Sequence, residues 1–288
     1  MNDSSKYLII LAGSPRGGEH TWKSVKKFVI NKLSADVAIC TGKNFLKNQS
    51  FLSYANYDWS FDEPKNWSDY YIKNYPKKWQ IPFSLGKNTG LYESGLIHLA
   101  IKDIIFKNYL EIINSYDFII YTRFDQLHLN YHLHGIEDKI LIPDGEDYFG
   151  ICDRHALIPK KYTKEFFGTI DFFFNNFKNF QSTKYLNCET LNMYHLHSFI
   201  DPSKILRFKR QSFTVSTKND LTNWRIPKYR LYLFNDLLLK YPDEFLYSMK
   251  YWLKNFNFLK LDKNNIRFLI NYYYLNLRSF IGLKIKTF

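Results

Sequence analysis

Residues 6–40 read KYLIILAGSPRGGEHTWKSVKKFVINKLSADVAIC, and this stretch decides the fold class. An apolar run is followed by a Gly-rich turn, then by a segment in which Trp22, Val25, Val29 and Leu33 recur at steps of three and four residues, and then by a second apolar run. Apolar residues at that spacing indicate a helix with one buried stripe. A strand, a helix and a second strand in this order predict the parallel sheet of an α/β protein.

Further apolar runs along the chain extend this sheet. A helix is indicated from Glu93 to Ser115, where isoleucines recur on one stripe, and the run YDFII at residues 116–120 predicts the next strand. Later strands are predicted at residues 139–143, 153–159, 204–208 and 212–217, and helices at residues 160–177 and from Cys188 onward. Residues 41–88 are polar and aromatic without a clear period, so we expect irregular loops over a sheet edge there.

The composition is that of a globular protein with a basic surface. The 288 residues are 45% hydrophobic, which suffices for a sizeable core, and the formal net charge of +13 favours polyanionic partners such as nucleotides, nucleic acid or anionic lipid. Three cysteines cannot all pair within one chain, which favours a reducing compartment. The apolar run at residues 7–12 is too short for a signal segment or a membrane span. We therefore expect a cytoplasmic protein.

The C-terminal region, residues 226–288, differs from the rest of the chain. It carries 11 Lys and Arg against 4 Asp and Glu, a net charge of +7, with aromatic residues interleaved. Two stripes predict helices: Leu231, Phe234, Leu238 and Tyr241, then Ile266, Leu269, Tyr273 and Phe280. We expect one domain at residues 1–225 and a basic helical region at 226–288. This region either binds the inner face of an anionic membrane through Trp252 and Tyr272–Tyr274 or forms an internal helical bundle.

The first candidate site is the turn GSPRGGE, Gly13 to Glu19, between a strand and a helix. Ligands of open α/β sheets bind beyond the carboxyl ends of the strands. Gly13, Gly17 and Gly18 allow backbone N–H groups to approach an anion, and Arg16 is placed to clamp a diphosphate. The alternative is a tight strand-to-helix turn without a ligand.

The second candidate site is YTRFDQ, residues 121–126, directly after the strand at 116–120. A carboxylate at the end of a central strand is costly to bury unless it is paired. Arg123 and Asp125 either form a structural ion pair or bind a ligand together. In the second case Arg123 binds phosphate, for which its planar fork is suited, and Asp125 faces a divalent ion or a ribose hydroxyl.

The third candidate site is PDGEDYFGICDRH, Pro143 to His155, in which ionisable side chains are unusually dense: Asp144, Glu146, Asp147, Asp153, Arg154 and His155. The alternatives are a solvated hairpin turn and a substrate pocket. Strand alternation places Asp153 and His155 on the same face, where one acts as a base and the other as a hydrogen-bonding or metal partner. Glu189, at a predicted helix start, is a second candidate base, although the helix dipole alone favours an acid there.

Four ordered motifs together resemble a group of glycosyltransferases of the GT-A kind, found in bacterial capsule and lipopolysaccharide gene clusters and in some large viruses. The motifs are RGGEHTWKS, YDFIIYTRFD, IPDGEDYFGICDRH and FTVSTKNDLTNWR, and the resemblance spans Tyr7 to Arg225. It implies a GT-A-like mixed sheet flanked by helices, a nucleotide-sugar donor and a glycan acceptor.

The resemblance also implies roles for the candidate residues. Arg16, Gly17 and Gly18 would bind the donor nucleotide, Arg123 and Asp125 its diphosphate, and Asp153, Arg154 and His155 would surround the reacting centre. The family's Asp-x-Asp holds Mn²⁺ or Mg²⁺, but here Arg123 replaces the first acid. A fixed cation therefore takes over part of the metal's charge, and a metal held by Asp125 would need a second ligand such as His155. For the base we rank Asp153 before Glu189.

Two other classes of function compete with this interpretation. The segment LAGSPRGGEHTW resembles the phosphate-binding opening of sulfotransferases, but Glu19 and His20 stand where small hydroxyl residues are needed. A nucleic-acid-binding protein is suggested by the basic, aromatic C-terminus. We expect no nucleic-acid partner, because the aromatic residues form helical stripes. Among His128, His132 and His134, extended alternation places His132 and His134 on one face, but no third zinc ligand stands at motif spacing.

Overall fold

The computed structural model describes residues 5–46, 49–76, 78–220, 222, 229–230, 237–254, 270 and 273–274. Contacts divide the chain into two compact units. The first unit consists of Met1–Ser14, Leu33–Arg123 and Leu133–Phe208, and the second of Pro15–Lys32, Phe124–His132 and Lys209–Phe288. The predicted boundary at Arg225 lies outside the described residues.

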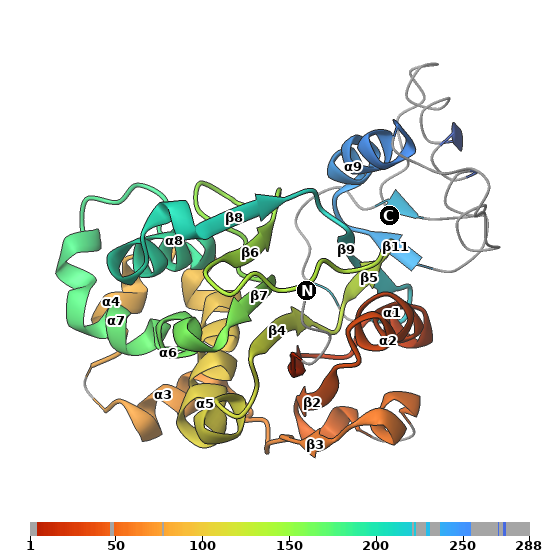
Figure 1. Cartoon of the computed structure of the whole chain (residues 1–288). Coiled ribbons are helices and arrows are strands. Elements are labelled where there is room, and N and C mark those ends of the chain that lie inside the picture. Colours follow the sequence, from red (N-terminus) through yellow and green to blue (C-terminus); the bar gives the residue numbers. More distant parts are fainter. Residues whose placement is uncertain are drawn as a thin grey trace. The chain divides into compact units, whose positions relative to one another are not determined.

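The first unit is built on a seven-stranded mixed sheet in the order β3-β2-β1-β4-β7-β6-β8 (Figure 1). Its strands are β1 (Tyr7–Ala12), β2 (Asp36–Cys40), β3 (Tyr57–Asp58), β4 (Phe118–Arg123), β6 (Ile140–Pro143), β7 (His155–Pro159) and β8 (Ile205–Phe208). Strands β3, β2, β1 and β4 are parallel, and β7 runs antiparallel to both β4 and β6. Strands β1 and β2, joined by a helix, confirm the predicted parallel opening and the mixed α/β fold class.

The register of this sheet determines which residues meet at its carboxyl edge. Ala12 at the end of β1 is paired with Arg123 at the end of β4. Because β7 runs in the opposite direction, it begins where β4 ends, and His155 is paired with Thr122. The Arg123 amide then donates to the carbonyl of Arg154 at 3.2 Å. The second and third sequence motifs therefore adjoin at one edge of the sheet.

Several helices, α5 to α8 among them, pack against one another beside this sheet (Figure 1). The helical segments of this unit are η2 (Lys43–Phe45), η3 (Ser50–Tyr54), α3 (Trp67–Asn74), α4 (Gln80–Ser84), the π-helical η4 (Leu91–Gly95), α5 (Leu96–Ile113), η5 (Lys160–Tyr162), α6 (Thr163–Phe167), α7 (Thr169–Asn176), η6 (Phe177–Phe180), α8 (Cys188–Phe199) and η7 (Pro202–Lys204). The helix predicted at residues 160–177 is broken at Gly168, between α6 and α7. Cys40, Cys152 and Cys188 are free and buried.

The expectation of irregular loops at residues 41–88 is wrong. This segment contains β3, α3 and α4, and its aromatic residues Tyr71, Trp79 and Phe83 form a buried cluster with residues of α5, α7 and α8. Helices of five to eight residues contain too few turns to show a hydrophobic period, so the sequence shows no clear signal for α3 and α4.

The second unit contains a four-stranded sheet in the order β10-β11-β9-β5. Its elements are α1 (Gly18–Val25), the π-helical η1 (Lys26–Ile30), α2 (Asn31–Leu33), β5 (Gln126–His128), β9 (Ser212–Thr217), β10 (Tyr229–Arg230), β11 (Leu237–Leu239) and α9 (Pro242–Lys254). Phe213, Val215, Leu237, Leu239 and Phe245 belong to its core. Packing of β9, β11 and α9 thus buries one apolar cluster.

The helix predicted at residues 231–241 is wrong where the structure describes it. Leu237–Leu239 form β11, which pairs antiparallel with β9, and Leu237 and Leu239 are both buried. A run of three leucines fits a strand and a helix equally well, and pairing with β9 decides between them. The helix predicted at residues 266–280 lies almost entirely outside the described residues. No helix in the described part of the chain is long and apolar enough to cross a membrane.

Candidate active site

Arg154 is the centre of a buried ionic cluster in the first unit. Its guanidinium lies 2.7 Å from Glu189 Oε1, 3.3 Å from Glu146 Oε2 and 3.7 Å from Asp153 Oδ1. Glu146 follows β6, Asp153 and Arg154 precede β7, and Glu189 lies in the first turn of α8. Burial of these side chains excludes the solvated hairpin for this part of residues 143–155.

Asp153 is surrounded by positive charge. Burial alone would raise the pKa of this carboxyl, but Arg154, His98, Lys102 and Arg123 outweigh that effect and hold the pKa below its ordinary value. Asp153 is 7% exposed, and its Oδ1 accepts no hydrogen bond from the residues that the structure describes. A buried carboxylate oxygen of this kind calls for a donor. The cluster therefore has a position at which a ligand hydroxyl or amide would be stabilised.

Helix α5 supplies two of the cationic or titratable groups. Nε2 of His98 is 3.2 Å from Nη1 of Arg123, and Nζ of Lys102 donates to Oδ1 of Asn192 at 3.3 Å. Lys102 is only 3% exposed, and its ammonium lies 4.2 Å from the centre of the Phe166 ring. Burial lowers the pKa of Lys102, against the opposing effect of Asp153.

Glu189 is more than an acid that complements a helix dipole. Asn187 caps α8 through its side chain, which accepts from the Thr190 amide at 2.8 Å, so the cap does not need Glu189. The carboxyl of Glu189 instead accepts from Arg154. Burial, only partly offset by Arg154, raises the pKa of Glu189 to about 7. A carboxyl with such a pKa exchanges protons readily at neutral pH.

The loop between β6 and β7 is conformationally strained. Glu146, Tyr148 and Phe149 have positive φ angles of 51°, 40° and 70°, in a region that residues with a side chain rarely adopt. Gly150 approaches α8 so closely that a Cβ atom would lie 2.1 Å from the Glu189 carbonyl carbon. Such strain is typical of functional segments that the surrounding structure holds in place.

The loop between β6 and β7 is held by an ion pair with β8 and also carries an exposed aromatic ring. Arg207 donates to both carboxylate oxygens of Asp147, at 2.7 and 3.0 Å, so Asp147 has a structural role. The Phe149 ring, 74% exposed, stacks on the ring of Tyr185 at 4.9 Å. The Tyr148 ring lies 5.7 Å from the Arg154 guanidinium carbon. The loop therefore links an exposed aromatic pair to the buried ionic cluster.

The strand β7 begins at His155, two residues after Asp153, so the predicted strand start at Asp153 is two residues too early, and the sharing of one face by Asp153 and His155 stays a prediction. His155 is buried, with its ring 6.3 Å from that of Phe208. Gly13 directly follows β1 and has a φ of 87°, and its amide donates to the Cys40 carbonyl at 3.0 Å. Of the predicted residues, the first unit thus holds Gly13, Arg123, Asp153, Arg154, His155 and Glu189.

Arg16, Gly17, Gly18 and Asp125 belong to the second unit. Gly17 and Gly18 have positive φ angles of 77° and 56°, as expected for the turn. The Gly17 amide donates to Asp220 Oδ2 at 2.9 Å, and the same oxygen accepts from the Thr217 amide. A carboxylate therefore occupies the position expected for a phosphate oxygen. Asp125 is buried, and its carbonyl accepts from the Val215 amide. The roles predicted for these four residues in donor binding stay predictions.

The metal held by Asp125 that the resemblance implies stays a prediction. No group of three or more His, Cys, Asp or Glu side chains in the described part of the chain is arranged to hold a metal ion. His132 is buried whereas His134 is exposed, so the two do not share a face as the sequence suggested. The acids around Arg154 are instead neutralised by fixed cations.

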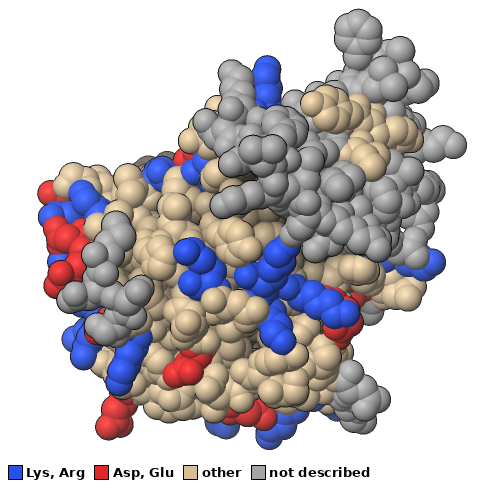
Figure 2. Space-filling view, turned by 45° about the vertical axis from the view of Figure 1, so that its right-hand side comes forward, with Lys and Arg blue, Asp and Glu red and all other residues tan. Residues whose placement is uncertain are grey.

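Sequence reasoning missed His98 and Lys102, although a signal for them exists. Both stand in the apolar stretch LIHLAIKDIIF of α5, four residues apart and hence on one helix face. A lysine and a histidine within a buried stretch indicate internal partners. Figure 2 shows one face of the molecule, where Lys and Arg side chains gather in patches with fewer Asp and Glu between them, in keeping with the net charge of +13.

Comparisons with known proteins give little additional information. No family model matches the chain, and no curated protein matches it. Among solved structures, one described as a glycosyltransferase involved in the glycosylation of the major capsid of PBCV-1 is similar at 9% identity, over 70% of this chain and 81% of that chain, with a TM-score of 0.34. The PaToxG glycosyltransferase is similar at 15% identity, over 68% of this chain and 69% of that chain, with a TM-score of 0.36. At these TM-scores neither similarity carries an argument.

Proposed function

We propose that the chain is a glycosyltransferase that moves a sugar from a nucleotide-sugar donor to a hydroxyl of a glycan acceptor. The observation that carries this proposal is the buried Asp153, whose Oδ1 accepts no hydrogen bond from the described residues and which is surrounded by Arg123, Lys102 and Arg154. The cluster lies at the carboxyl edge of the parallel strands, where α/β proteins bind ligands. The resemblance of four sequence motifs to GT-A enzymes supports the same conclusion.

In this proposal Arg123 and Lys102 bind the donor diphosphate. Negative charge develops on the leaving nucleoside diphosphate as its bond to the sugar breaks, and positioned cations in a buried site stabilise that charge. Arg123 offers a planar fork that matches phosphate oxygens in pairs, and Lys102 offers a compact charge. Every step of the proposed transfer is assigned to side chains of the chain itself.

We assign the roles of Glu189 and Asp153 from the opposite directions in which their pKa values are shifted. The Glu189 carboxylate, with a pKa raised to about 7, takes the proton of the acceptor hydroxyl. The acceptor oxygen forms a bond to the anomeric carbon, and the nucleoside diphosphate leaves with the electron pair of the broken bond. Asp153, whose pKa is held low, stays ionised and accepts a hydrogen bond from a sugar hydroxyl. Glu189 thus replaces Asp153 as the first candidate base, and Arg154 holds both carboxylates.

For the acceptor we propose a surface polysaccharide, of the capsule or lipopolysaccharide kind, on the sequence resemblance alone. The exposed Phe149 and Tyr185 rings offer a flat apolar surface next to the cluster, suited to the apolar face of a sugar ring. Trp252, which is expected to contact a membrane, also has a structural role that competes with such contact: its indole N–H donates to the Arg210 carbonyl at 3.0 Å.

A transfer assay tests the proposal. The purified chain is incubated with UDP- and GDP-linked sugars and a mixture of oligosaccharide acceptors, and released nucleotide is measured. We expect release with one donor class, and Arg123→Met lowers kcat/KM by about 100-fold or more. Lys164→Met, an exposed lysine on α6, is the matched control and retains activity. Absence of release with every donor, or full activity in Arg123→Met, would contradict the proposal.

A further inference from the structure

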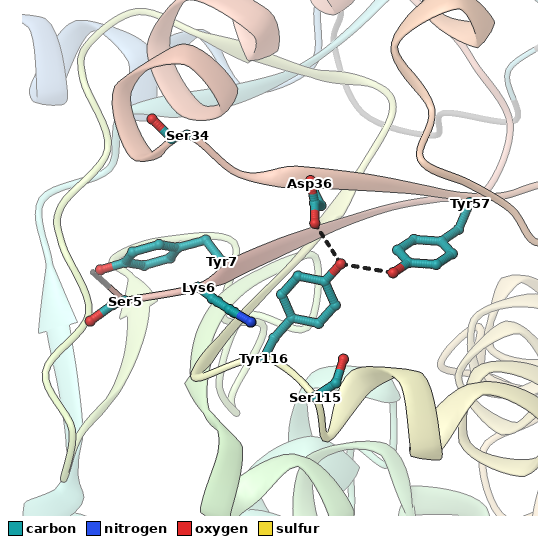
Figure 3. Close-up of a pocket in the computed structure, with 8 residues that line it drawn as sticks. All are labelled: Ser5, Lys6, Tyr7, Ser34, Asp36, Tyr57, Ser115 and Tyr116. Carbon is teal, nitrogen blue, oxygen red and sulfur yellow. Dashed lines mark hydrogen bonds between the residues drawn. The ribbon is translucent and has the colours of Figure 1, made fainter. Parts of the chain in front are cut away.

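A cavity of about 370 Å³ opens at the amino edge of the first unit's parallel strands (Figure 3). Its lining comes from the starts of β1, β2 and β3 and from the turn between α5 and β4: Ser5, Lys6, Tyr7, Ser34, Asp36, Tyr57, Ser115 and Tyr116. The volume lies near the lower end of the range of small-molecule sites, about 300–1,000 Å³. Nothing in the proposed transfer reaction uses this edge.

A chain of hydrogen bonds orders one side of the cavity. The Tyr116 hydroxyl lies 2.6 Å from Asp36 Oδ2, to which it donates, and 3.0 Å from the Tyr57 hydroxyl. Figure 3 shows these three polar ends converging, with the Lys6 side chain reaching toward the Tyr116 ring. Because Tyr116 donates to the carboxylate, Tyr57 donates to Tyr116 and keeps its own oxygen as an acceptor for a ligand.

Hydrogen bonds also hold the start of β1, which forms another side of the cavity. The Lys6 amide donates to Asp117 Oδ2 at 2.8 Å, and the Lys6 carbonyl accepts from the Asp117 amide at 3.0 Å. The Tyr7 hydroxyl accepts from the Gly135 amide at 3.1 Å. The cavity is therefore formed before any ligand binds, which reduces the entropy lost on binding.

The cavity offers a ligand both a hydrogen-bond donor and a hydrogen-bond acceptor. Among the described residues, the Lys6 ammonium has no carboxylate within ion-pair distance, and Asp36 Oδ1 accepts no hydrogen bond. Lys6 supplies donors and Asp36 an acceptor, and their charges cancel. A lining whose formal charges cancel offers a polyanion no net attraction.

We propose that this cavity binds a neutral, hydroxyl-rich ligand, a hexose or one hexose unit of a glycan. Sugar hydroxyls donate and accept at once, so they match Asp36 on one side and Lys6 and Tyr57 on another. The half-buried ring of Tyr57 provides apolar surface for the C–H face of the sugar ring. The cavity lies one strand length, about 20 Å, from the carboxyl edge. It is therefore a second carbohydrate site, separate from the candidate active site and independent of the proposed function.

Ligand-observed NMR with saturation transfer tests this inference on the full chain. The probes are D-glucose, D-galactose and N-acetyl-D-glucosamine, with D-glucose 6-phosphate as a charged comparison. Lys6→Met removes an exposed charge, and Asp36→Asn keeps an acceptor for Tyr116 while it removes the other charge. Lys73→Met, an exposed lysine on α3, is the matched control. Arg123→Met reports on the candidate active site.

We expect at least one neutral hexose to bind the wild-type chain. Its affinity should fall by about tenfold in Lys6→Met and in Asp36→Asn and stay unchanged in Lys73→Met and Arg123→Met. Absence of hexose binding, retention in both cavity variants, loss in Arg123→Met alone, or binding of the phosphorylated sugar alone would overturn the inference. Because Lys6 is exposed, its variant folds, and circular dichroism verifies this for both variants. A chain that lacks transferase activity but binds hexose here would contradict only the proposed function.

Discussion

Arg154 donates from Nη2 to Glu189 Oε1 at 2.7 Å, and this bond joins the residue before β7 to the first turn of α8. The same guanidinium lies near Glu146 and Asp153, so one arginine faces three buried carboxyl groups. Removing one partner from a buried ion pair is costly, because the remaining charges are left without compensation. Arg154 is thus required both for the fold of this edge and for the arrangement of the two proposed catalytic carboxyl groups.

We predict that Arg154→Met lowers the free energy of unfolding by about 3–5 kcal/mol, because three buried carboxyl groups lose their shared cation. Urea denaturation followed by circular dichroism measures the effect. The control, Lys164→Met, changes an exposed side chain and should shift the free energy by less than about 0.5 kcal/mol. Equal stability of Arg154→Met and the control would show that the cluster contributes nothing to the fold.

Glu189 gives a prediction for the pH dependence of stability. Its pKa is raised from the ordinary value of 4.5 to about 7, so the folded chain holds a proton that the unfolded chain releases between these values. The resulting stabilisation is complete below pH 4.5 and is lost as the pH rises through about 7, by about 3 kcal/mol. Urea titrations at several pH values should show this decline for the wild type relative to Glu189→Gln. A constant difference between the two proteins would refute the raised pKa.

Two glycine substitutions separate backbone strain from steric contact. Gly17→Ala combines a φ of 77° with a Cβ atom 2.3 Å from Thr21 Cγ2, and Thr21 is held by its hydrogen bond to the Gly18 carbonyl. Gly13→Ala has a φ of 87° but no atom within 4 Å of the new Cβ. We expect losses of about 3 kcal/mol for Gly17→Ala and about 1 kcal/mol for Gly13→Ala in thermal unfolding. Equal losses would show that the Thr21 side chain moves away at no cost, so that the steric contact contributes nothing.

Lys102→Met distinguishes a catalytic role from a structural one. Methionine fills similar space beside the Phe166 ring, but it leaves Asn192 Oδ1 without its donor and removes one of the cations near Asp153, so the free energy of unfolding should fall by about 1–3 kcal/mol. If Lys102 binds the donor diphosphate, kcat/KM falls by about 100-fold. Unchanged transferase kinetics with unchanged stability would remove Lys102 from the proposed site.

The exposed ring of Phe149 leads to a prediction for the acceptor. Phe149→Ala removes the outer ring of the pair with Tyr185, so KM for the glycan acceptor should rise by about tenfold while donor binding is unchanged. Phe199→Ala, an exposed phenylalanine at the end of α8, is the matched control. If both substitutions raised the acceptor KM equally, the loss of any exposed aromatic ring would explain the change, and Phe149 would have no specific role in acceptor binding.

Sequence periodicity predicted the elements of the sheet that are long or strongly apolar. Residues 6–40 were enough to predict the parallel opening, and the polar residues at 121–126 and 143–155 indicated the edge at which Arg123 and Arg154 adjoin. The pairing of Arg154 with Glu189 was not predictable, because it depends on a helix 35 residues away along the chain. Likewise β11 owes its conformation to pairing with β9, which local propensity does not encode.

A crystal structure of the chain with a bound nucleotide-sugar tests the central claim most directly. We expect the diphosphate oxygens to lie within hydrogen-bond distance of the Arg123 guanidinium, with a sugar hydroxyl donating to Asp153 Oδ1. A donor bound at another surface of the protein, with Arg123 and Asp153 making no contact with it, would contradict the claim.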